Sequence, residues 1–321
     1  MSMKGIAGIL AFAFAASVFA QGWPSKPVRI IVAYPPGGGI DVMARQIAAK
    51  LTAEWGQPVV VENRPGANTI VASDAVAKSA PDGHTILFTT DATFSINPHL
   101  YVKLPFDTQR DFIPLTMLVL LQQLLVAHPS LQADTLLQLI ALAKSNPGKI
   151  NYASYGSGSQ PHLSGEMLKH KAGIDLVHVP YKGISLAVPA VVAGEVQLTF
   201  AGIATSMGPL KSGRIKAIAI GGTKRSPIWP DVPTFAELGY PEVETHAWFG
   251  LFLPAGSPRQ AVARIHQDAK KILEEPGFRQ TQLIDKGYEV VGSSPEEFSA
   301  YIVKDRESRG RAVKISGAKA E

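Results

Sequence analysis

The feature that most restricts the fold of this chain is an alternation of short β-branched segments with helix-like segments. Residues 28–33 (VRIIVA), 57–62 (QPVVVE) and 84–90 (HTILFTT) have the composition of buried strands. Residues 41–55 and 68–79 lie between them and place apolar side chains at helical spacing. A β-α-β-α-β order of this kind predicts a parallel sheet with helices packed on its faces.

A second unit with the same alternation starts near residue 124. Its strand-like segments are residues 124–127, 150–153, 177–179, 196–200 and 216–220, and its helix-like segments are 135–145, 162–170 and 185–193. A last strand is predicted at 245–254, followed by helices at 258–275 and 294–309. A chain of 321 residues is long enough for two domains.

No third sheet is predicted after residue 250, so the C-terminal helices are expected to return to the first unit. The chain would then cross between two lobes near residues 118–125 and 243–250. This arrangement predicts one lobe made of residues 21–123 and 247–321, and a second lobe made of residues 124–246.

The first 20 residues have the pattern of a signal peptide. Lys4 provides a positive charge, residues 5–16 are apolar, and small residues precede a cleavage point after Ala20. The apolar stretch is too short to span a bilayer as a helix. We therefore expect residues 1–20 to be removed and the mature chain to be exported to the periplasm.

Charge and residue usage exclude several classes of partner and site. The formal net charge of +5 is mild and the basic residues are scattered, so a nucleic-acid partner is not expected. The charged stretch from Lys304 to Lys319 is expected to be a solvated tail. The chain has no cysteine, which excludes disulfides and a thiolate nucleophile. The eight histidines show neither H-x-x-x-H nor H-E-x-x-H spacing, so no metal site is predicted.

A glycine-rich loop, YPPGGGID (34–41), separates the first predicted strand from the first helix. Glycine lets the backbone turn sharply and lets a ligand approach the bare N–H groups. The following helix adds unpaired N–H donors and a partial positive charge, which suit an anion. In an open α/β sheet this position lies at the carboxyl ends of the strands, where ligands bind. The alternative is a tight turn in which Asp41 only caps the helix.

A second loop of this type, SYGSGSQPH (154–162), separates a strand from a helix in the other unit. Its serines add hydroxyl donors, and Pro161 suits the first turn of a helix. The alternative is a flexible loop without a ligand. If the two loops face each other across a cleft, they would hold a carboxylate from both sides, and a dicarboxylate would engage both.

The sequence lacks the common motifs for nucleotide binding and for a catalytic serine. The first loop does not match G-x-G-x-x-G, and neither G-x-x-x-x-G-K-[ST] nor G-x-S-x-G occurs in the chain. A nucleotide is therefore disfavoured, and no cofactor is predicted. Ser157 and His162 lie at one helix start, but no acidic partner is evident. No catalytic residue is assigned, and a secreted Ser/His hydrolase remains the weaker alternative.

These loops, with several other segments, make the chain resemble the Bug-type substrate-binding receptors of tripartite tricarboxylate transporters. The resemblance covers nearly the whole mature chain, and each matching segment is weak alone while the set is highly specific. The segments are YPPGGGIDVMARQIAAKL (34–51), VVVENRPGA (59–67), APDGHTILF (80–88), INPHLYVKLPFD (96–107), YASYGSGSQPHLSGEML (152–168), VPYKG (179–183), GRIKAIAI (213–220) and WPDVPTFAELGYP (229–241).

The resemblance implies a periplasmic binding protein-like α/β fold of type II, a Venus flytrap of two Rossmann-like lobes joined by two crossing strands. It also implies that both loops hold ligand carboxylates, partly through water. The positions that match the family's binding loops are Tyr34, Pro36, Gly37, Gly38 and Asp41, then Thr90 and Thr93, then Ser154, Gly156, Ser157, Gly158, Ser159 and His162, and finally Tyr181.

Two segments depart from the family pattern. Many relatives carry an Asp directly after the strand at 196–200, where this chain has Ala201-Gly202. An acidic group in the cleft can pair with the ammonium of an amino acid, so Ala201 argues against an amino-acid ligand. Ile184-Ser185-Leu186 replace the small residues and Pro that often follow YKG, which indicates a more apolar pocket. A neutral aliphatic or aromatic carboxylate is therefore favoured over a zwitterion.

The leading hypothesis is a monomeric, non-enzymatic periplasmic binding protein for a small mono- or dicarboxylate. The membrane permease subunits of a tripartite transporter would recognise its closed form. Within the class of binding proteins, the alternative is a ligand sensor that contacts a sensor ectodomain of a two-component system.

Overall fold

The computed structural model describes residues 22–222, 224–243 and 245–319, so the predicted signal peptide lies outside the described residues. The strands are β1 Val28–Val32, β2 Val59–Asn63, β3 Thr85–Thr90, β4 Phe112–Ala127, β5 Ile150–Ser154, β6 Leu176–Pro180, β7 Leu198–Gly202, β8 Lys216–Ile220, β9 His246–Pro254 and β10 Tyr288–Val290. The α-helices are α2 Gly39–Trp55, α3 Ile70–Ala77, α4 Asn97–Leu100, α5 Leu136–Ser145, α6 Gln160–Ala172, α7 Ile184–Val192, α8 Ile203–Lys211, α9 Arg259–Glu274, α10 Pro276–Phe278 and α11 Pro295–Ser316.

Every strand and helix predicted from the sequence overlaps an element of the same type. The elements that were not predicted are α4, α8, α10, β10 and three short π- or 3₁₀-helical segments, at Ala92–Ile96, Arg279–Leu283 and Ile284–Lys286. None of the helices in the described part of the chain is both long and apolar enough to cross a membrane.

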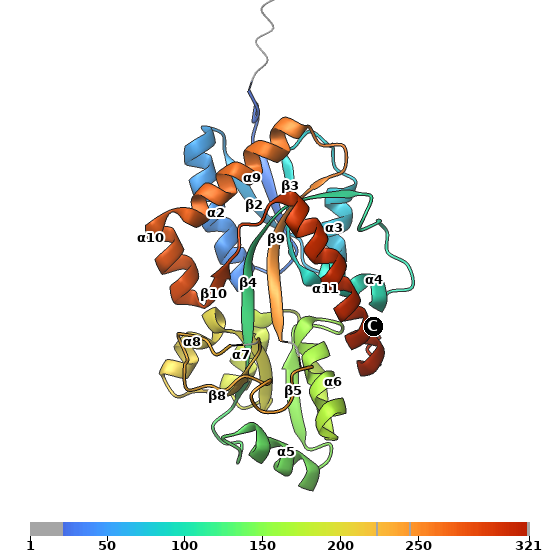
Figure 1. The fold of residues 1–321 in the computed structure, drawn as a ribbon, viewed down its shortest axis with the longest axis vertical. Coiled ribbons are helices and arrows are strands. Elements are labelled where there is room, and N and C mark those ends of the chain that lie inside the picture. The colour runs from blue at the N-terminus through green and yellow to red at the C-terminus, as the bar shows by residue number, and fades with distance from the viewer. Residues whose placement is uncertain (1–21, 223, 244, 320–321) are drawn as a thin grey trace, which may run out of the picture.

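The strands form one mixed sheet in the order β2-β1-β3-β9-β4-β7-β5-β6, and β8 and β10 pair with β4 outside this path. β1 lies parallel between β2 and β3, and β5 lies parallel between β6 and β7. These two parallel sets are the centres of an upper half and a lower half of the molecule in Figure 1. The α/β architecture with parallel strands, predicted from the alternation of segments, is therefore confirmed.

Two antiparallel strands, β4 and β9, carry the chain between the halves (Figure 1). The first part of β4 pairs with β9 and β10 in the upper half, and residues 123–127 pair with β7 and β8 in the lower half. The predicted strand at 124–127 is the end of β4, which begins at Phe112. The chain leaves the upper half along β4 and returns to it at the start of β9.

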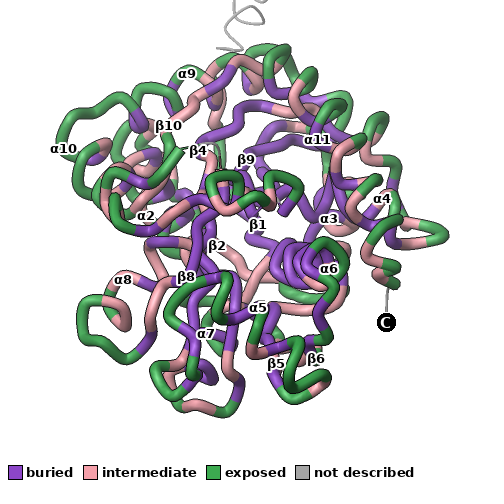
Figure 2. The backbone as a smooth tube through the Cα atoms, turned by 60° about the horizontal axis from the view of Figure 1, so that its bottom comes forward, coloured by how far each residue is buried: buried purple, intermediate pink, exposed green. Residues whose placement is uncertain are grey.

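Both halves of the sheet are covered on both faces. In the upper half, α2 and α9 cover one face with side chains such as Leu51 and Ile265, while Phe94 and Phe298 pack on the opposite face. The lower half has two further apolar cores, one with α5 and α6 and one with α7 and α8. Figure 2 shows the strands buried inside, with exposed residues in the outer loops and helix ends. This burial explains the continuous apolar composition of the strands.

The C-terminal helix α11 starts on the upper half and reaches the lower half, where it packs on α6 (Figure 1). Its end contributes Val313 to a small apolar cluster with Leu100 and Leu163. The prediction of a solvated tail at 304–319 was wrong, because Asp305 and Arg309 are buried inside this stretch. Charge composition alone cannot distinguish a tail from a helix whose charged side chains pair in the interior.

Candidate functional site

A cavity lies between the two halves, beside the carboxyl ends of β1, β3 and β7. The volume open to the centre of a water molecule is about 80 Å³. The lining of the cavity is mainly apolar. One water needs roughly 10–15 Å³ by this measure, so a small organic ligand fits. The lining comprises Tyr34, Pro35, Gly38, Gly39, Ile40, Thr90, Leu121, Gln123, Tyr155, Ile184, Ser185, Gly202, Ile203, Ala204, Thr205, Ala247, Phe249, Lys286, Gly287 and Tyr288.

Three helices begin at this cavity. Gly38, Gly183 and Gly202 precede α2, α7 and α8, and no side chain caps any of these helix starts. The starts of α3, α6 and α9 also lack a side-chain cap, whereas α5 and α11 begin with capping boxes, so the distinguishing feature of α2, α7 and α8 is that all three begin at one cavity. Uncapped N–H groups and the positive ends of three helix dipoles favour an anion between them.

The charged side chains around the cavity also favour an anion. Lys286 is the charged residue of the described lining, and none of those lining residues is acidic. A more open groove of about 590 Å³ adjoins the cavity and shares Lys286, Ser185 and Tyr288 with it. That groove adds Arg214 and, among its described residues, no acid. The charged side chains in the described lining of the cavity and the groove are therefore all positive.

Two tyrosines, one from each glycine-rich loop, meet at the cavity. The rings of Tyr34 and Tyr155 lie 6.0 Å apart and nearly perpendicular. The Tyr34 hydroxyl shares a hydrogen bond of 3.0 Å with Thr90, and the Tyr155 hydroxyl accepts one of 3.2 Å from Gln123. Burial raises the pKa of both phenols well above the usual value of 10.0, so both stay neutral.

Asp41 lies in the first turn of α2 with its carboxylate turned into the protein. It accepts hydrogen bonds from the Gly37 N–H at 3.0 Å, from Asn63 at 2.9 Å and from Arg45 at 3.1 Å. Burial favours the neutral acid, but these donors outweigh it and lower the pKa, so Asp41 is ionised. The carboxylate therefore ties the first loop to α2 and β2.

Of the other site residues predicted on the upper half, some line the cavity and others are buried or exposed away from it. Thr90 lines the cavity, whereas Thr93 is fully buried and shares its hydroxyl with Thr69 and Thr89, both at 2.7 Å. Pro36 and Gly37 are exposed. Gly37 lines the adjoining groove, and its φ of +86° is one that favours glycine.

The second loop directs much of its hydrogen bonding inward. The Ser154 hydroxyl donates to the Gly156 carbonyl at 3.1 Å and also contacts His178, and the Ser159 hydroxyl donates to the same carbonyl at 2.6 Å. His162 Nδ1 accepts from the Gly158 N–H at 2.9 Å. These bonds hold the loop against the start of α6.

The tip of the second loop touches the upper half. A Cβ added at Gly158 would clash with Leu100 of α4 and lie 3.4 Å from Asn68. Ser157 is half-buried and lies outside the cavity lining. The second loop therefore reaches the cavity with Tyr155 and contacts the opposite half with Gly158.

Tyr181 and Ala201 lie near the cavity without lining it. The Tyr181 side chain is directed to Glu195, whose hydrogen bond is one reason, after burial, that the pKa of Tyr181 is raised. Ala201 is fully buried in β7, opposite Leu124 of β4. The residues that follow it, from Gly202 to Thr205, form the cavity wall at the start of α8.

Ile184 and Ser185, which were expected to shape the pocket, line the cavity, whereas the start of α8 and the centre of the cavity were not predicted. The start of α8 repeats the pattern of the first loop, a strand followed by glycine and then a helix, and this signal could have identified it. No role was predicted for Gln123, which directly precedes the predicted strand at 124–127. Phe249 and Tyr288 reach the cavity from β9 and β10, which no local pattern predicts.

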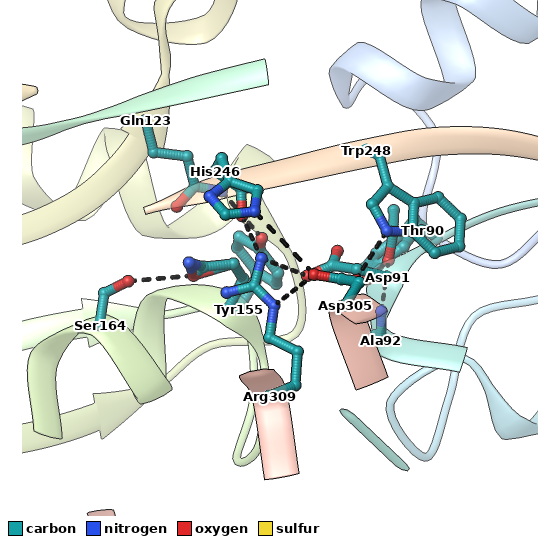
Figure 3. Close-up of polar contacts among 12 residues, drawn as sticks. Thr90, Asp91, Ala92, Gln123, Tyr155, Ser164, His246, Trp248, Asp305 and Arg309 are labelled. Atoms are coloured by element: carbon teal, nitrogen blue, oxygen red, sulfur yellow. Dashed lines mark hydrogen bonds and ion pairs between the residues drawn. The ribbon is translucent and has the colours of Figure 1, made fainter. Parts of the chain in front are cut away.

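Behind Thr90 lies a buried cluster of charges (Figure 3). Arg309 of α11 lies 3.6 Å from Asp91 and 3.3 Å from Asp305, and it donates to the His246 carbonyl at 2.6 Å. Trp248 donates to Asp305 at 2.9 Å. Burial raises the pKa of Asp91 from 3.8 to about 7, with Arg309 opposing the shift. The cluster joins α11 to β3 and to the crossing at the start of β9.

No group of histidine and acidic side chains able to hold a metal ion occurs among the residues that the structure describes. The polar groups that face the cavity are hydroxyls, one amide, backbone N–H groups and one ammonium. This set can hold an anion by hydrogen bonds.

Comparison with known proteins places these features in a family. The pattern of the "Tripartite tricarboxylate transporter family receptor" (TctC) matches residues 43–317, which is most of the chain. The solved structure of Rpa4515 from R. palustris with adipate is 30% identical, covers 92% of this chain and 99% of its own, and superposes with a TM-score of 0.88.

Two further solved structures agree. MatC from Rhodopseudomonas palustris, with bound malate, is 31% identical, covers 91% of this chain and 100% of its own, and has a TM-score of 0.85. The periplasmic binding protein BugD is 30% identical, covers 93% of this chain and 100% of its own, and has a TM-score of 0.86. The expected periplasmic binding protein fold is therefore confirmed.

Proposed function

The chain belongs to the tripartite tricarboxylate transporter receptor family, and from this premise we propose that it captures a small mono- or dicarboxylate between its two halves and delivers it to a tripartite transporter. Members of the family are periplasmic solute-binding receptors and not enzymes. The hydrolase considered from Ser157 and His162 is thereby excluded.

The observation that carries the proposal is the meeting of three uncapped helix starts at one cavity without an acidic residue in its described lining. Micromolar affinity requires about 8 kcal/mol of binding free energy. Hydrogen bonds to a charged group contribute roughly 1.5–3 kcal/mol each, so a few N–H donors on one carboxylate are sufficient. The adipate of Rpa4515 and the malate of MatC support a carboxylate as the ligand.

The predicted site residues have different roles in this proposal. Tyr34, Gly38 and Thr90 contact the ligand, and Asp41 positions the first loop through the Gly37 N–H. In the second loop, Ser154, Gly156, Ser159 and His162 hold the loop in shape, and Ser157 and Gly158 face the opposite half as the cleft closes. Pro36, Gly37, Thr93, Tyr181 and Ala201 shape the surroundings of the ligand.

The two halves are proposed to act as lobes with the predicted boundaries, 21–123 with 247–321 and 124–246. Rotation at the crossing of β4 and β9 would open the cavity, and contact between Gly158 and α4 would accompany closure. The closed form would then be recognised by the membrane permease subunits. The apolar lining favours a ligand with a hydrocarbon body over an amino acid.

A thermal-shift screen followed by calorimetry tests the proposal. Carboxylates of two to eight carbons should raise the melting temperature because ligands that bind only the folded state stabilise it by mass action. Sugars, amines and inorganic cations serve as controls and should not shift it. A shift with sugars or cations and none with any carboxylate would contradict the anion site.

A further inference from the structure

Asp91 is a buried acid directly behind the wall of the cavity. It follows Thr90, the last residue of β3, which lines the cavity. Asp91 is only 1% exposed, and its Oδ2 has no hydrogen-bond partner among the described residues. The guanidinium of Arg309 lies 3.6 Å from this oxygen, beyond hydrogen-bonding distance. A buried carboxylate with so weak a pairing is costly to ionise.

The same guanidinium also serves a second buried acid, Asp305 (Figure 3). Arg309 Nε lies 3.3 Å from Asp305, which in addition accepts a hydrogen bond of 2.9 Å from Trp248. Asp305 is therefore the better stabilised of the two carboxylates. Because two acids share one guanidinium, the three side chains carry an excess negative charge when both acids are ionised, and Asp91 is the acid that a proton neutralises most readily.

The other titratable groups around Asp91 come from three further elements. Tyr34, between β1 and α2, and Tyr155, between β5 and α6, line the cavity. Burial is the main cause of the raised pKa of both phenols, and the negative charge of Asp91 adds to it. His246, at the start of β9, faces Asp305 with Nε2 at 3.9 Å. The charge of Asp91 thus acts on the wall of the cavity where the carboxylate is proposed to bind.

We propose that carboxylate capture is linked to the uptake of a proton by Asp91, so that the protein with neutral Asp91 binds a carboxylate more tightly than the protein with ionised Asp91. The inference rests on the proposed function and concerns the regulation of the same site. An ionised Asp91 repels a carboxylate through the protein interior, where charges interact more strongly than in water. A bound carboxylate therefore favours neutral Asp91, and by reciprocity neutral Asp91 favours the bound carboxylate.

The pH range of this linkage follows from the groups involved. Burial raises the pKa of Asp91 to about 7, and a second negative charge nearby would raise it further. Affinity should therefore be constant at low pH, where Asp91 is neutral with or without a carboxylate. It should fall as the pH rises through 7 and level off where Asp91 is ionised in both forms.

Calorimetry with adipate and with malate at several pH values tests the inference. The wild-type protein should bind each acid about threefold more weakly at pH 8.5 than at pH 6.5. Simple carboxyl groups titrate about 2 units below this range, so the two acids contribute little to the change. Titrations at pH 7 in MOPS and in imidazole buffer, which differ in protonation enthalpy, should give an uptake of roughly 0.3 proton per carboxylate bound.

Two substitutions in the cluster should change this behaviour in different ways. Asp91→Asn keeps the shape of the side chain and removes its titration, so it should abolish the proton uptake. At pH 8.5 it should bind about threefold more tightly than the wild-type protein, a gain that a merely structural role would not produce. Asp305→Asn leaves Arg309 to pair with Asp91 alone, so the fall in affinity should move to lower pH.

His246→Gln is the control for a second source of the proton. A protonated histidine attracts an anion and would give a pH dependence of the same sign. The His246 side chain faces Asp305 and lies outside the described lining of the cavity. The variant should therefore keep both the proton uptake and the fall in affinity with rising pH.

Different results separate the two proposals. Carboxylate binding without proton uptake, or an uptake that Asp91→Asn keeps, would overturn the role of Asp91 and leave carboxylate capture intact. If neither adipate nor malate binds, the carboxylate with the largest thermal shift replaces them, and failure of every carboxylate at every pH would contradict the proposed function itself. If Asp91→Asn does not fold, the wild-type uptake and the shift in Asp305→Asn decide the matter.

Discussion

The two glycine-rich loops have similar sequences, since each separates a strand from a helix, but they contact the cavity differently. The loop between β1 and α2 lines it with Tyr34, Gly38 and the start of α2. The loop between β5 and α6 lines it with Tyr155 alone, while Gly158 contacts α4 of the opposite half.

The difference between the loops comes from where their hydrogen bonds go. In the second loop, the hydroxyls of Ser154 and Ser159 and the ring of His162 bond to the loop's own backbone. In the first loop, Asp41 holds only the Gly37 N–H, and α2 begins without a side-chain cap. The start of α6 also lacks a side-chain cap, so the two loops differ in the internal hydrogen bonds of the second loop and not in the capping of their helices.

The largest effect is expected at the tip of the second loop. Gly158→Val should lower the free energy of unfolding by about 3 kcal/mol, because φ is +75° and the new side chain would displace Leu100. Gly173→Val is the control, since Gly173 also has a positive φ but has open space around it. Urea unfolding measures both, and equal losses would contradict a contact between the halves.

A pH dependence is expected from Asp91, which raises the pKa of both loop tyrosines and faces Arg309 and Asp305. Its pKa of about 7 lies above its usual 3.8, so the folded state holds a proton that unfolding releases between these values. The free energy of unfolding should therefore fall as the pH rises from 5 to 7, by on the order of 1–2 kcal/mol. Urea unfolding of Asp91→Asn should show a flatter profile, and an unchanged profile would exclude Asp91 as the source.

Substitutions in the two loops should weaken ligand affinity to different extents. Gly38→Val would fill the cavity toward Ile184 and should weaken carboxylate binding more than tenfold, a loss of over about 1.4 kcal/mol. Ser157→Val, outside the lining, should weaken binding less, by about threefold. Calorimetry with one carboxylate compares the two variants. A greater loss of affinity in Ser157→Val would contradict this, because it would mean that the second loop makes the stronger contact with the ligand.

The smallest effect is expected at the mouth of the cavity. Lys286 is exposed and has mainly a long-range influence, so Lys286→Gln should weaken carboxylate binding about twofold at low salt. The difference should shrink as salt screens the charge. Titrations at two ionic strengths test this, and a salt-independent loss would indicate direct contact with the ligand.

Local patterns predicted the strands and helices well because alternation of apolar segments and glycine turns is a short-range signal. The first loop, with Tyr34 and Gly38, was found for the same reason. The start of α8 and the amide of Gln123 were missed, since their importance depends on which segments meet across the sheet. The buried pair of Arg309 and Asp305 was mistaken for a solvated tail for this reason too.

The sequence by itself determined the α/β class and the order of elements, and it predicted an anion as the ligand, because propensity, periodicity and helix starts act over a few residues. The tertiary structure decided which helix starts face the cavity and which loop contacts the other half. Those properties depend on burial and on partners distant in the chain. The role of a residue at the cavity therefore depends on the hydrogen bonds that it makes in the folded protein, and its residue type alone does not determine it.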